Sequence, residues 1–593
     1  MNISPIDWGI IAAFFIISLL IGIFTSKTAG KSSKDFFLSG RNMPWWLLGV
    51  SMVATTFSAD TPNLVTDIVR VNGVSGNWGW WCFLLTGMLT VFVYAKLWRR
   101  SEITTDLEFY ELRYGGKPAA FLRGFRAIYL GVFFNIVIMA TVSLAAIKIG
   151  GVMLGLTPVQ TLLIASIVTV IYSSLGGLKG VLLTDFFQFF IAMAGAIGAA
   201  IYILDLPQIG SLENLLTHPN VSDKLSFFPD FSNMNEVIPM LLVPIAIQWW
   251  ATWYPGAEPG GGGYIAQRML SAKNEKNAIG ATLFFNVAHY ALRPWPWIII
   301  ALSSLIIFPE ISDLQKAFPH MPADKLGNDL AYSAMLTYLP TGLIGIVLAS
   351  LIAAVMSTLS THLNWGSSYV VNDFYLRFVK PEASDKELVN VGRISTVVLM
   401  GLAALLALSL SNALEAFNIL LQIGAGTGLI FILRWFWWRI NSYTEISAMI
   451  ISFIVALFFE TINPKFNIIS IPEGMEYLKL LYGVSITTAT WVTVTLVTRP
   501  EKEEVLLSFY KKVKPAAYGW RKVLDKHPEV EAEQGQLPFE IGLMVTGSVA
   551  IYAALFAIGF WLYDNVLSAS IATVISAVGF YILFRGWNKI KLF

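Results

Sequence analysis

The chain has few of the residues that most catalytic and metal sites need. It carries a single cysteine, Cys82, and five histidines in 593 residues. One cysteine excludes an intrachain disulfide and a multi-cysteine metal site. The sequence has no phosphate-cradling motif, metal-ligand cluster or nucleophile–base arrangement. We therefore expect that the protein is not an enzyme.

Charge is also scarce. Only 13% of the residues are charged and 56% are hydrophobic, with a mean hydropathy of +0.64. Soluble domains carry about 25% charged residues. The N-terminus lacks a basic segment and a small-residue cleavage site, so the first apolar run is expected to be a retained helix. The composition predicts an all-α integral membrane protein.

A spanning helix needs about 20 mostly apolar residues. That criterion predicts about fifteen spans, near 7–26, 44–71, 76–98, 119–155, 158–176, 181–205, 236–260, 276–308, 327–377, 389–410, 412–438, 442–461, 475–498, 539–563 and 566–588. Lysine and arginine gather in the loops on one side, which places the N-terminus outside and the C-terminus in the cytoplasm. We expect a multi-pass protein of the plasma (inner) membrane.

The second span contains a proline among polar residues, in Ala54-Thr55-Thr56-Phe57-Ser58-Ala59-Asp60-Thr61-Pro62. Proline disfavours a continuous helix at itself and at the residue before it. Unwound backbone at membrane depth occurs only where protein or a wet cavity surrounds it. The carbonyls that such a break frees can hold a cation, although a proline kink can also serve packing alone.

The seventh span is interrupted as well, because Pro255, Pro259 and the glycines 260–263 cannot continue a helix. The two interrupted spans stand five helices apart, which predicts two five-helix repeats of inverted topology. The expected division is 1–43 (extra helix and loop), 44–205 (first repeat), 206–235 (outer loop), 236–438 (second repeat), 439–498 (two helices), 499–538 (charged cytoplasmic connector) and 539–593 (helical hairpin). The connector is expected to be a solvated loop, although its basic half could lie against anionic lipid.

The ninth span offers hydroxyl groups that could face the first break. Ala354, Ser357 and Thr358 stand at i, i+3 and i+4, so they share one helix face. Together with the carbonyls of Ala54 and Phe57 they would supply oxygens without formal charge, which suit a weakly held monovalent cation. Small residues on membrane helices can instead simply allow close packing.

Several stretches resemble the sodium/solute symporter family, which includes sodium-coupled glucose and proline carriers. They are Ser51–Ser58, Tyr172–Val181 with Thr184, Asp185 and Gln188, Gln267–Lys273, and Ala354–Thr358 with Asn364 and Asn372–Tyr375. The resemblance covers about residues 8–500 and implies a LeuT-type fold. It implies a sodium site made by the carbonyls of Ala54, Phe57 and Ala354 and the hydroxyls of Ser357 and Thr358. Asp185 matches an acid linked to cation coupling, although it could instead cap a helix start.

The solute does not follow from the resemblance. Sugar carriers of the family have a histidine where this chain has Thr61, and the glycine run at 260–263 looks like an insertion. The candidate pocket is formed by Ser58, Asp60, Thr61, Trp253, Tyr254, Glu258, Phe417 and Asn418. Asp60 is the sharpest candidate, because an acid at membrane depth is costly and usually functional. If it is ionised, it would favour a cationic or zwitterionic solute or a second sodium ion; it could instead be an outer-vestibule residue or a helix cap.

Other charged residues in the spans have structural interpretations. Lys148 is expected to extend to the membrane surface, and Arg434 is expected to anchor the chain at the cytoplasmic interface. Arg293 could contact the solute, but packing is the preferred interpretation.

These features predict a sodium-coupled secondary active symporter, with Na⁺ as the co-transported ion. It would import a small polar organic solute (a sugar, polyol, amino acid or carboxylate) by alternating access. The expected partners are that solute and the lipid bilayer, with no nucleic acid; the sequence does not indicate an oligomeric state. The alternative is a transporter-like membrane sensor that acts through a separate signalling partner.

Overall fold

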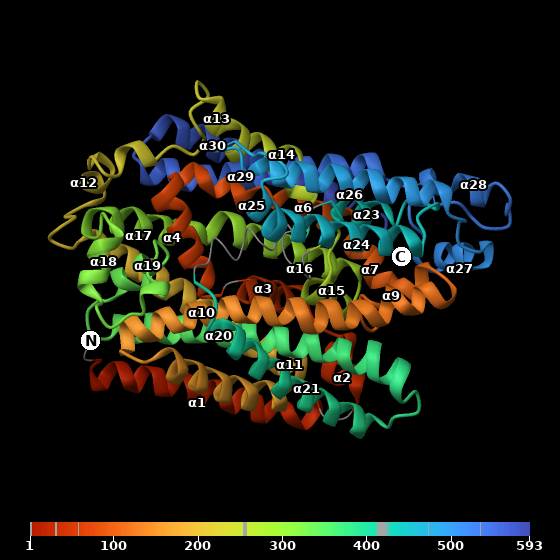
Figure 1. Ribbon diagram of the computed structural model, residues 1–593, viewed down its shortest axis with the longest axis horizontal. Helices are drawn as coiled ribbons and strands as arrows, with labels where there is room; N and C mark the ends of the chain where they lie inside the picture. The colour runs from red at the N-terminus through yellow and green to blue at the C-terminus, as the bar shows by residue number, and fades with distance from the viewer. Residues whose placement is uncertain are drawn as a thin grey trace.

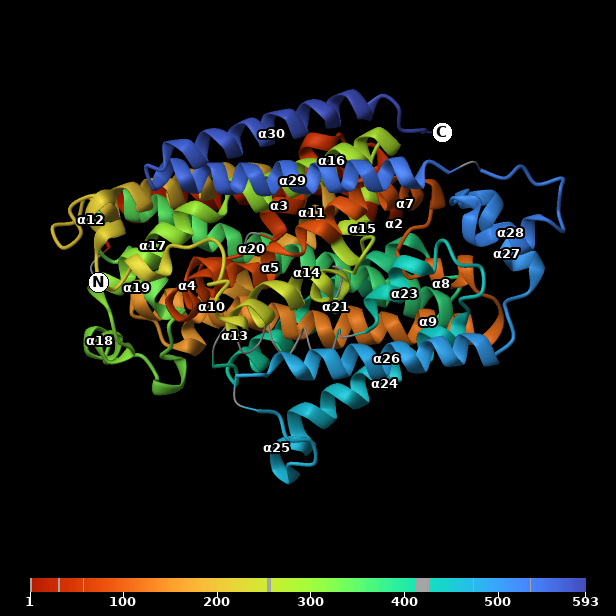
Figure 2. The same ribbon diagram turned by 90° about the horizontal axis from the view of Figure 1, so that it is seen from above.

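The protein is a bundle of long α-helices that run roughly side by side (Figures 1 and 2). The computed structural model describes residues 3–29, 32–56, 58–252, 258–411, 424, 426–472, 474–533 and 535–592. Within these ranges the secondary structure is helical, and no strand occurs beyond one isolated bridge between Met43 and Ala272. The all-α prediction is therefore confirmed for the described residues.

Eleven described helices are long and apolar enough to cross a membrane on their own, and each coincides with a predicted span. Two more predicted spans contain shorter apolar helices, Trp45–Thr56 and Pro158–Ile171. The predicted span 236–260 is broken into short helical pieces, and much of 412–438 lies outside the described residues. The total of fifteen spans stays a prediction, as do the boundaries of the two repeats.

The two predicted repeats supply the centre of the bundle. The first contains α3 (Trp45–Thr56), α4 (Asp60–Asn72), α5 (Trp78–Trp81), α6 (Leu84–Leu89), α7 (Ala95–Ser101), α9 (Gly116–Ile128), α10 (Asn135–Leu154) and α11 (Pro158–Leu204), with α8 (Glu108–Arg113) in a loop. The second contains α14 (Val243–Ala246), α15 (Gly263–Ser271), α16 (Glu275–Val287), α17 (Pro294–Ile307), α19 (Leu330–Leu336), α20 (Leu343–Ser368), α21 (Asp385–Ala407) and α23 (Gly428–Leu433).

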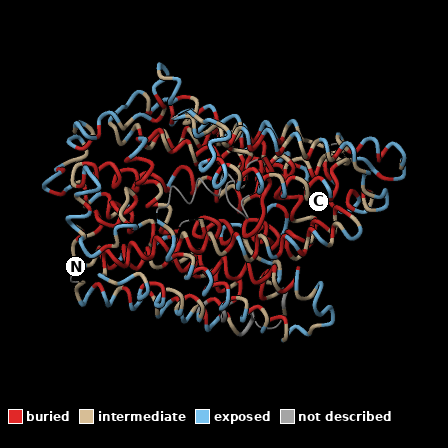
Figure 3. The backbone as a smooth tube through the Cα atoms, in the orientation of Figure 1, coloured by how far each residue is buried: buried red, intermediate tan, exposed pale blue. Residues whose placement is uncertain are grey.

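The remaining long helices lie around this centre. They are α1 (Pro5–Ala29), α24 (Ser442–Leu457), α26 (Tyr477–Val497), α29 (Leu537–Leu562) and α30 (Val566–Trp587). Helices α29 and α30 pack against each other along one edge, and α24 and α26 form a second pair along the opposite edge in Figure 2. Buried residues are concentrated in the middle of the bundle, whereas exposed residues follow its periphery and ends (Figure 3).

Helix α11 is two spans that meet without a loop. Its 47 residues would measure about 70 Å as one straight helix, far more than a bilayer. The two parts join at Gly177, whose φ of 53° and ψ of −166° are not helical. Glycine adopts a positive φ at no steric cost. The predicted spans 158–176 and 181–205 are thus both present.

Both predicted helix breaks are observed. Helix α3 ends at Thr56 and α4 begins at Asp60, with Pro62 in its first turn. In the seventh span, regular helix ends by Trp250 and resumes at Gly263. Gly260 and Gly261 lie between these points with φ values of 86° and 91°.

The ninth predicted span begins too early in the sequence. Residues 330–336 form the separate short helix α19, and the spanning helix α20 begins only at Leu343. Gly342, with a φ of 89°, immediately precedes it. The spanning helix therefore covers less of the predicted range 327–377 than expected.

The connector 499–538 is folded rather than a solvated loop, which corrects the expectation. Its helix α27 (Glu503–Val513) packs against α8. The rings of Phe509 and Trp520 are fully buried. The guanidinium of Arg113, on α8, lies 4.9 Å from the centre of the Trp520 ring, a cation–π contact that favours this docking.

Two charged side chains lie deeper than expected. Lys148 does not extend to the membrane surface; it is fully buried, and its Nζ lies 2.5 Å from Oδ2 of Asp329. Arg434 is not an interfacial anchor; it is 3% exposed and lies over the ring of Phe109. In both cases a partner from a distant part of the chain compensates for the loss of hydration.

We predict that Lys148→Met lowers the stability of the protein by about 3–5 kcal/mol, because it leaves the Asp329 carboxylate buried without its partner. The double variant Lys148→Met with Asp329→Leu should recover most of the loss. Thermal unfolding of the purified protein in detergent measures both effects. Lys316→Ala is the control, since that ion pair is exposed. A Lys148→Met protein that melts like the parent would contradict the structural role of the pair.

Candidate functional site

Side chains from outside α3 donate hydrogen bonds to the carbonyls in its last turn. The Thr55 carbonyl accepts a hydrogen bond from Oγ1 of Thr358 at 2.7 Å. The Val53 and Thr56 carbonyls accept from the guanidinium of Arg293. Among the described residues, no donor reaches the Ala54 carbonyl.

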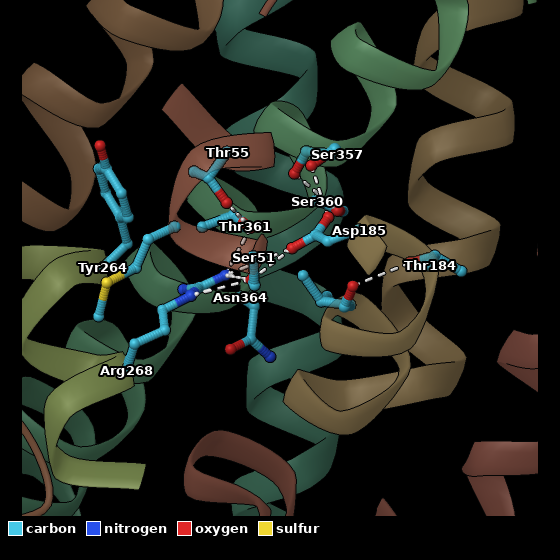
Figure 4. A network of polar contacts seen from close by, with 12 residues as sticks. Ser51, Thr55, Thr184, Asp185, Tyr264, Arg268, Ser357, Ser360, Thr361 and Asn364 are labelled. Carbon is cyan, nitrogen blue, oxygen red and sulfur yellow. Dashed lines mark hydrogen bonds and ion pairs between the residues drawn. The ribbon is translucent and has the colours of Figure 1, made fainter. Parts of the chain in front are cut away.

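Helix α20 carries the two predicted hydroxyl groups, one of which contacts the break. Ser357 and Thr358 are buried, and Thr358 donates to the carbonyl of Thr55, a residue that is not among the predicted sodium ligands. Ser357 donates instead to Oδ1 of Asp185, at 2.5 Å (Figure 4). Ala354 is buried one turn earlier on the same face. The break, α20 and α11 thus meet through two hydroxyl groups.

Asp185 lies at the centre of a polar network that joins four helices (Figure 4). Its Oδ2 accepts from the hydroxyl of Ser51 on α3, and Nη2 of Arg268 lies 3.9 Å away. Arg268, on α15, also donates to Ser51 and to Thr361 on α20. Asp185 stands well inside α11, eight residues beyond Gly177, so it does not cap a helix start.

The two helix breaks touch each other directly. The hydroxyl groups of Thr56 and Tyr264 lie 2.9 Å apart, which joins the end of α3 to the start of α15. One more bond, from Oγ1 of Thr61 to the Thr56 carbonyl at 3.2 Å, folds α4 back onto the same point. The geometry therefore brings both interruptions to one place.

Three of the predicted pocket residues lie at the start of α4. Ser58, Asp60 and Thr61 follow the break, and Oγ of Ser58 and Oδ1 of Asp60 are buried without a hydrogen-bond partner among the described residues. The side-chain amide nitrogen and oxygen of the neighbouring Asn63 are also buried without a hydrogen-bond partner among the described residues. Buried polar atoms of this kind are usually satisfied by water, an ion or a ligand.

Glu258, another predicted pocket residue, has a charged partner within the protein. Its Oε1 accepts from Nη2 of Arg126, on α9, at 2.6 Å, and both side chains are buried. The two residues line a small cavity of about 40 Å³ with Thr252, Thr427 and Phe431 among its walls. Glu258 is therefore held by a cation of the protein itself.

Five predicted site residues cannot be placed. Phe57, Trp253, Tyr254, Phe417 and Asn418 lie outside the described residues. Conversely, sequence reasoning missed Arg126 and Tyr264, and it assigned Arg293 to packing. A charge inside an apolar span was the available signal for Arg126, whereas Tyr264 carries no signal apart from its place after the glycine run.

Comparisons with known proteins identify the family of the chain. The sodium:solute symporter family matches residues 36–452. The sodium/glucose cotransporter of Vibrio parahaemolyticus is 27% identical over 518 residues, which cover 82% of this chain and 90% of that protein. The sodium/mannose cotransporter SLC5A10 of Bos taurus is 26% identical over 470 residues, covering 74% and 76%. The sodium/sialic acid symporter SiaT of Proteus mirabilis (strain HI4320) is 25% identical over 470 residues, covering 76% and 89%.

A solved structure of a Na⁺-coupled sialic acid symporter, in a substrate-bound outward-open state, has the same fold. It superposes with a TM-score of 0.65 at 20% identity and covers 84% of this chain and all of that one. The predicted LeuT-type helical fold is thus confirmed. The chain belongs to the sodium:solute symporter family, and it is a sodium-coupled solute symporter of the membrane rather than an enzyme.

Proposed function

We propose that the protein imports a small polyhydroxylated solute, such as a sugar or polyol, together with sodium. The relatives named above carry glucose, mannose and sialic acid, and another carries myo-inositol. All of these solutes present several hydroxyl groups. The observation that carries the proposal is the group of buried, unpartnered atoms of Ser58, Asp60 and Asn63 beside the break. A carboxylate, an amide and a hydroxyl can each bond to the hydroxyl groups of a solute.

The sodium ion is proposed to bind between the break and α20. Its ligands are the carbonyls of Ala54, Phe57 and Ala354 and the hydroxyls of Ser357 and Thr358. Support comes from the Ala54 carbonyl, which no donor among the described residues reaches, and from the Thr358 hydroxyl, which bonds to the Thr55 carbonyl at the break. The Ser357 hydroxyl lies on the same helix face and bonds to Asp185. Oxygens without formal charge favour a monovalent ion, since Ca²⁺ sites usually include carboxylates.

Asp185 is proposed to couple ion binding to helix movement. Its carboxylate bonds to Ser51 and Ser357, and Ser357 is also a proposed sodium ligand. A sodium ion that draws the Ser357 oxygen toward itself changes the bond to Asp185 and hence the contact with α3. Ion binding would therefore alter the packing of α3, α11 and α20 together.

The orientation is proposed from the loop charges: N-terminus outside, C-terminus in the cytoplasm, in the plasma (inner) membrane. Sodium would then enter from outside and stabilise the arrangement in which the solute pocket is accessible. Two groups of helices would rock around a site near mid-depth, as in transporters with inverted repeats.

We expect polyhydroxylated solutes to raise the melting temperature of the purified protein, and to do so more strongly in sodium than in choline. A ligand that binds the folded state stabilises it in proportion to the logarithm of its concentration over its Kd. The screen compares hexoses, polyols, sialic acid, amino acids and simple carboxylates. Stabilisation by amino acids alone would contradict the proposed solute class.

The double variant Ser357→Ala with Thr358→Ala should raise the sodium concentration for half-maximal uptake by about tenfold or more, roughly 1.4 kcal/mol. Uptake into proteoliposomes at varied external sodium measures it. Ser350→Ala is the matched control, because Ser350 lies on the same helix and its hydroxyl donates to the Val347 carbonyl of that helix. An unchanged sodium dependence in the double variant would remove these residues from the site.

Asp60→Asn should raise the KM for the solute by about 10- to 100-fold, the effect of weakening one hydrogen bond to a charged group. The sodium concentration for half-maximal uptake should change far less, since Asp60 is not a proposed sodium ligand. Asp230→Asn, in the exposed outer loop, is the control. A KM equal to that of the parent would exclude Asp60 from the pocket.

A further inference from the structure

Arg293 lies at a junction that brings its side chain to the first helix break. It stands between the π-helical turn Ala288–Leu292 and α17, which begins with Pro294. The residue is only 1% exposed. A buried guanidinium requires compensation for its lost hydration, so the partners of Arg293 show what the side chain does.

Those partners are the open end of α3. Nη1 donates to the Val53 carbonyl at 3.1 Å, and Nη2 donates to the Thr56 carbonyl at 3.3 Å. Nη2 also contacts Nδ1 of His289. The ring centre of Trp297 lies 5.1 Å from the guanidinium carbon. Each of these groups attracts a cation.

A cation is well suited to this position for two reasons. The last carbonyls of a helix lack donors, and the helix dipole places partial negative charge at the same end. Val53 and Thr56 are three residues apart, so their carbonyls lie on one side of the helix. The planar guanidinium can bond to both at once, whereas a lysine ammonium is a single point charge.

The other side of the same turn is held by α20. Thr358 bonds to the Thr55 carbonyl, and the Ala54 carbonyl is left without a described donor. Arg293 and Thr358 therefore fix the carbonyls on both sides of Ala54. We propose that Arg293 is a positioning residue for ion coupling: its guanidinium is a permanently bound cation that caps α3 and orients the Ala54 carbonyl toward sodium.

This role rests on the sodium site proposed above, and it explains how an unwound helix keeps one geometry without bound solute. Because the guanidinium is attached to α17, it stays when sodium leaves. The end of α3 then remains capped in the empty carrier, and only the free carbonyl changes its partner during transport.

Arg293→Ala tests this role by chemical rescue. The variant should leave a hole lined by two carbonyls, the His289 nitrogen and the Trp297 ring, which fits a free guanidinium ion. Uptake should fall by at least about tenfold, the effect of losing a hydrogen bond to a charged group. Added guanidinium should restore much of it, and methylammonium, which lacks the planar fork of N–H groups that matches the two carbonyls, should restore less. Arg585→Ala, on exposed α30, is the control and should respond to neither.

Sodium binding is measured separately, as the sodium-dependent rise in melting temperature of the purified variant. Arg293→Ala should need a higher sodium concentration for this rise, and guanidinium should reduce that requirement. A folded Arg293→Ala protein that binds sodium like the parent, or that guanidinium does not restore, would overturn the proposal.

Arg293→Lys covers the case in which Arg293→Ala does not fold. Lysine keeps the charge but loses one of the two bonds, so the sodium requirement should rise while the KM for the solute stays near the parent value. An unchanged sodium requirement would overturn the role of Arg293.

If the proposed sodium site is wrong but Arg293 still caps α3, the variants give a different set of results. In that case Ser357→Ala with Thr358→Ala leaves sodium dependence unchanged, while guanidinium still restores uptake by Arg293→Ala.

Discussion

A peptide carbonyl that leaves a helix inside a membrane finds no water to bond to, and this constraint organises the centre of the protein. The break after Thr56 exposes a full turn of carbonyls. Side chains from α17, α20 and α4 are directed to that turn, through Arg293, Thr358 and Thr61. The helices that surround the break are therefore tied to it by hydrogen bonds, and among the described residues no donor reaches the Ala54 carbonyl, the proposed sodium ligand.

The sequence was sufficient to locate the breaks, because proline and consecutive glycines act locally on the backbone. Pro62 and the run 260–263 interrupt their helices whatever surrounds them. The shared face of Ser357 and Thr358 was also predictable, since it follows from helical periodicity. The family resemblance then indicated sodium coupling, which the comparisons confirm.

Partners of buried charges were not predictable in the same way. Lys148 and Asp329 are 181 residues apart, and neither has a local pattern that points to the other. Arg126 meets Glu258 and Arg293 meets the end of α3 for the same reason, through tertiary packing. The helical periodicity of α20 does not set its register against α3, so the bond from Thr358 to the Thr55 carbonyl could not be predicted.

The buried pair of Lys148 and Asp329 has an electrical consequence. A single charge that moves through 100 mV of membrane potential does about 2.3 kcal/mol of work. Two opposite charges held 2.5 Å apart move through the field as a neutral unit, and their work nearly cancels. The protein can therefore carry ionised groups in its interior and still change conformation without the voltage acting strongly on that pair.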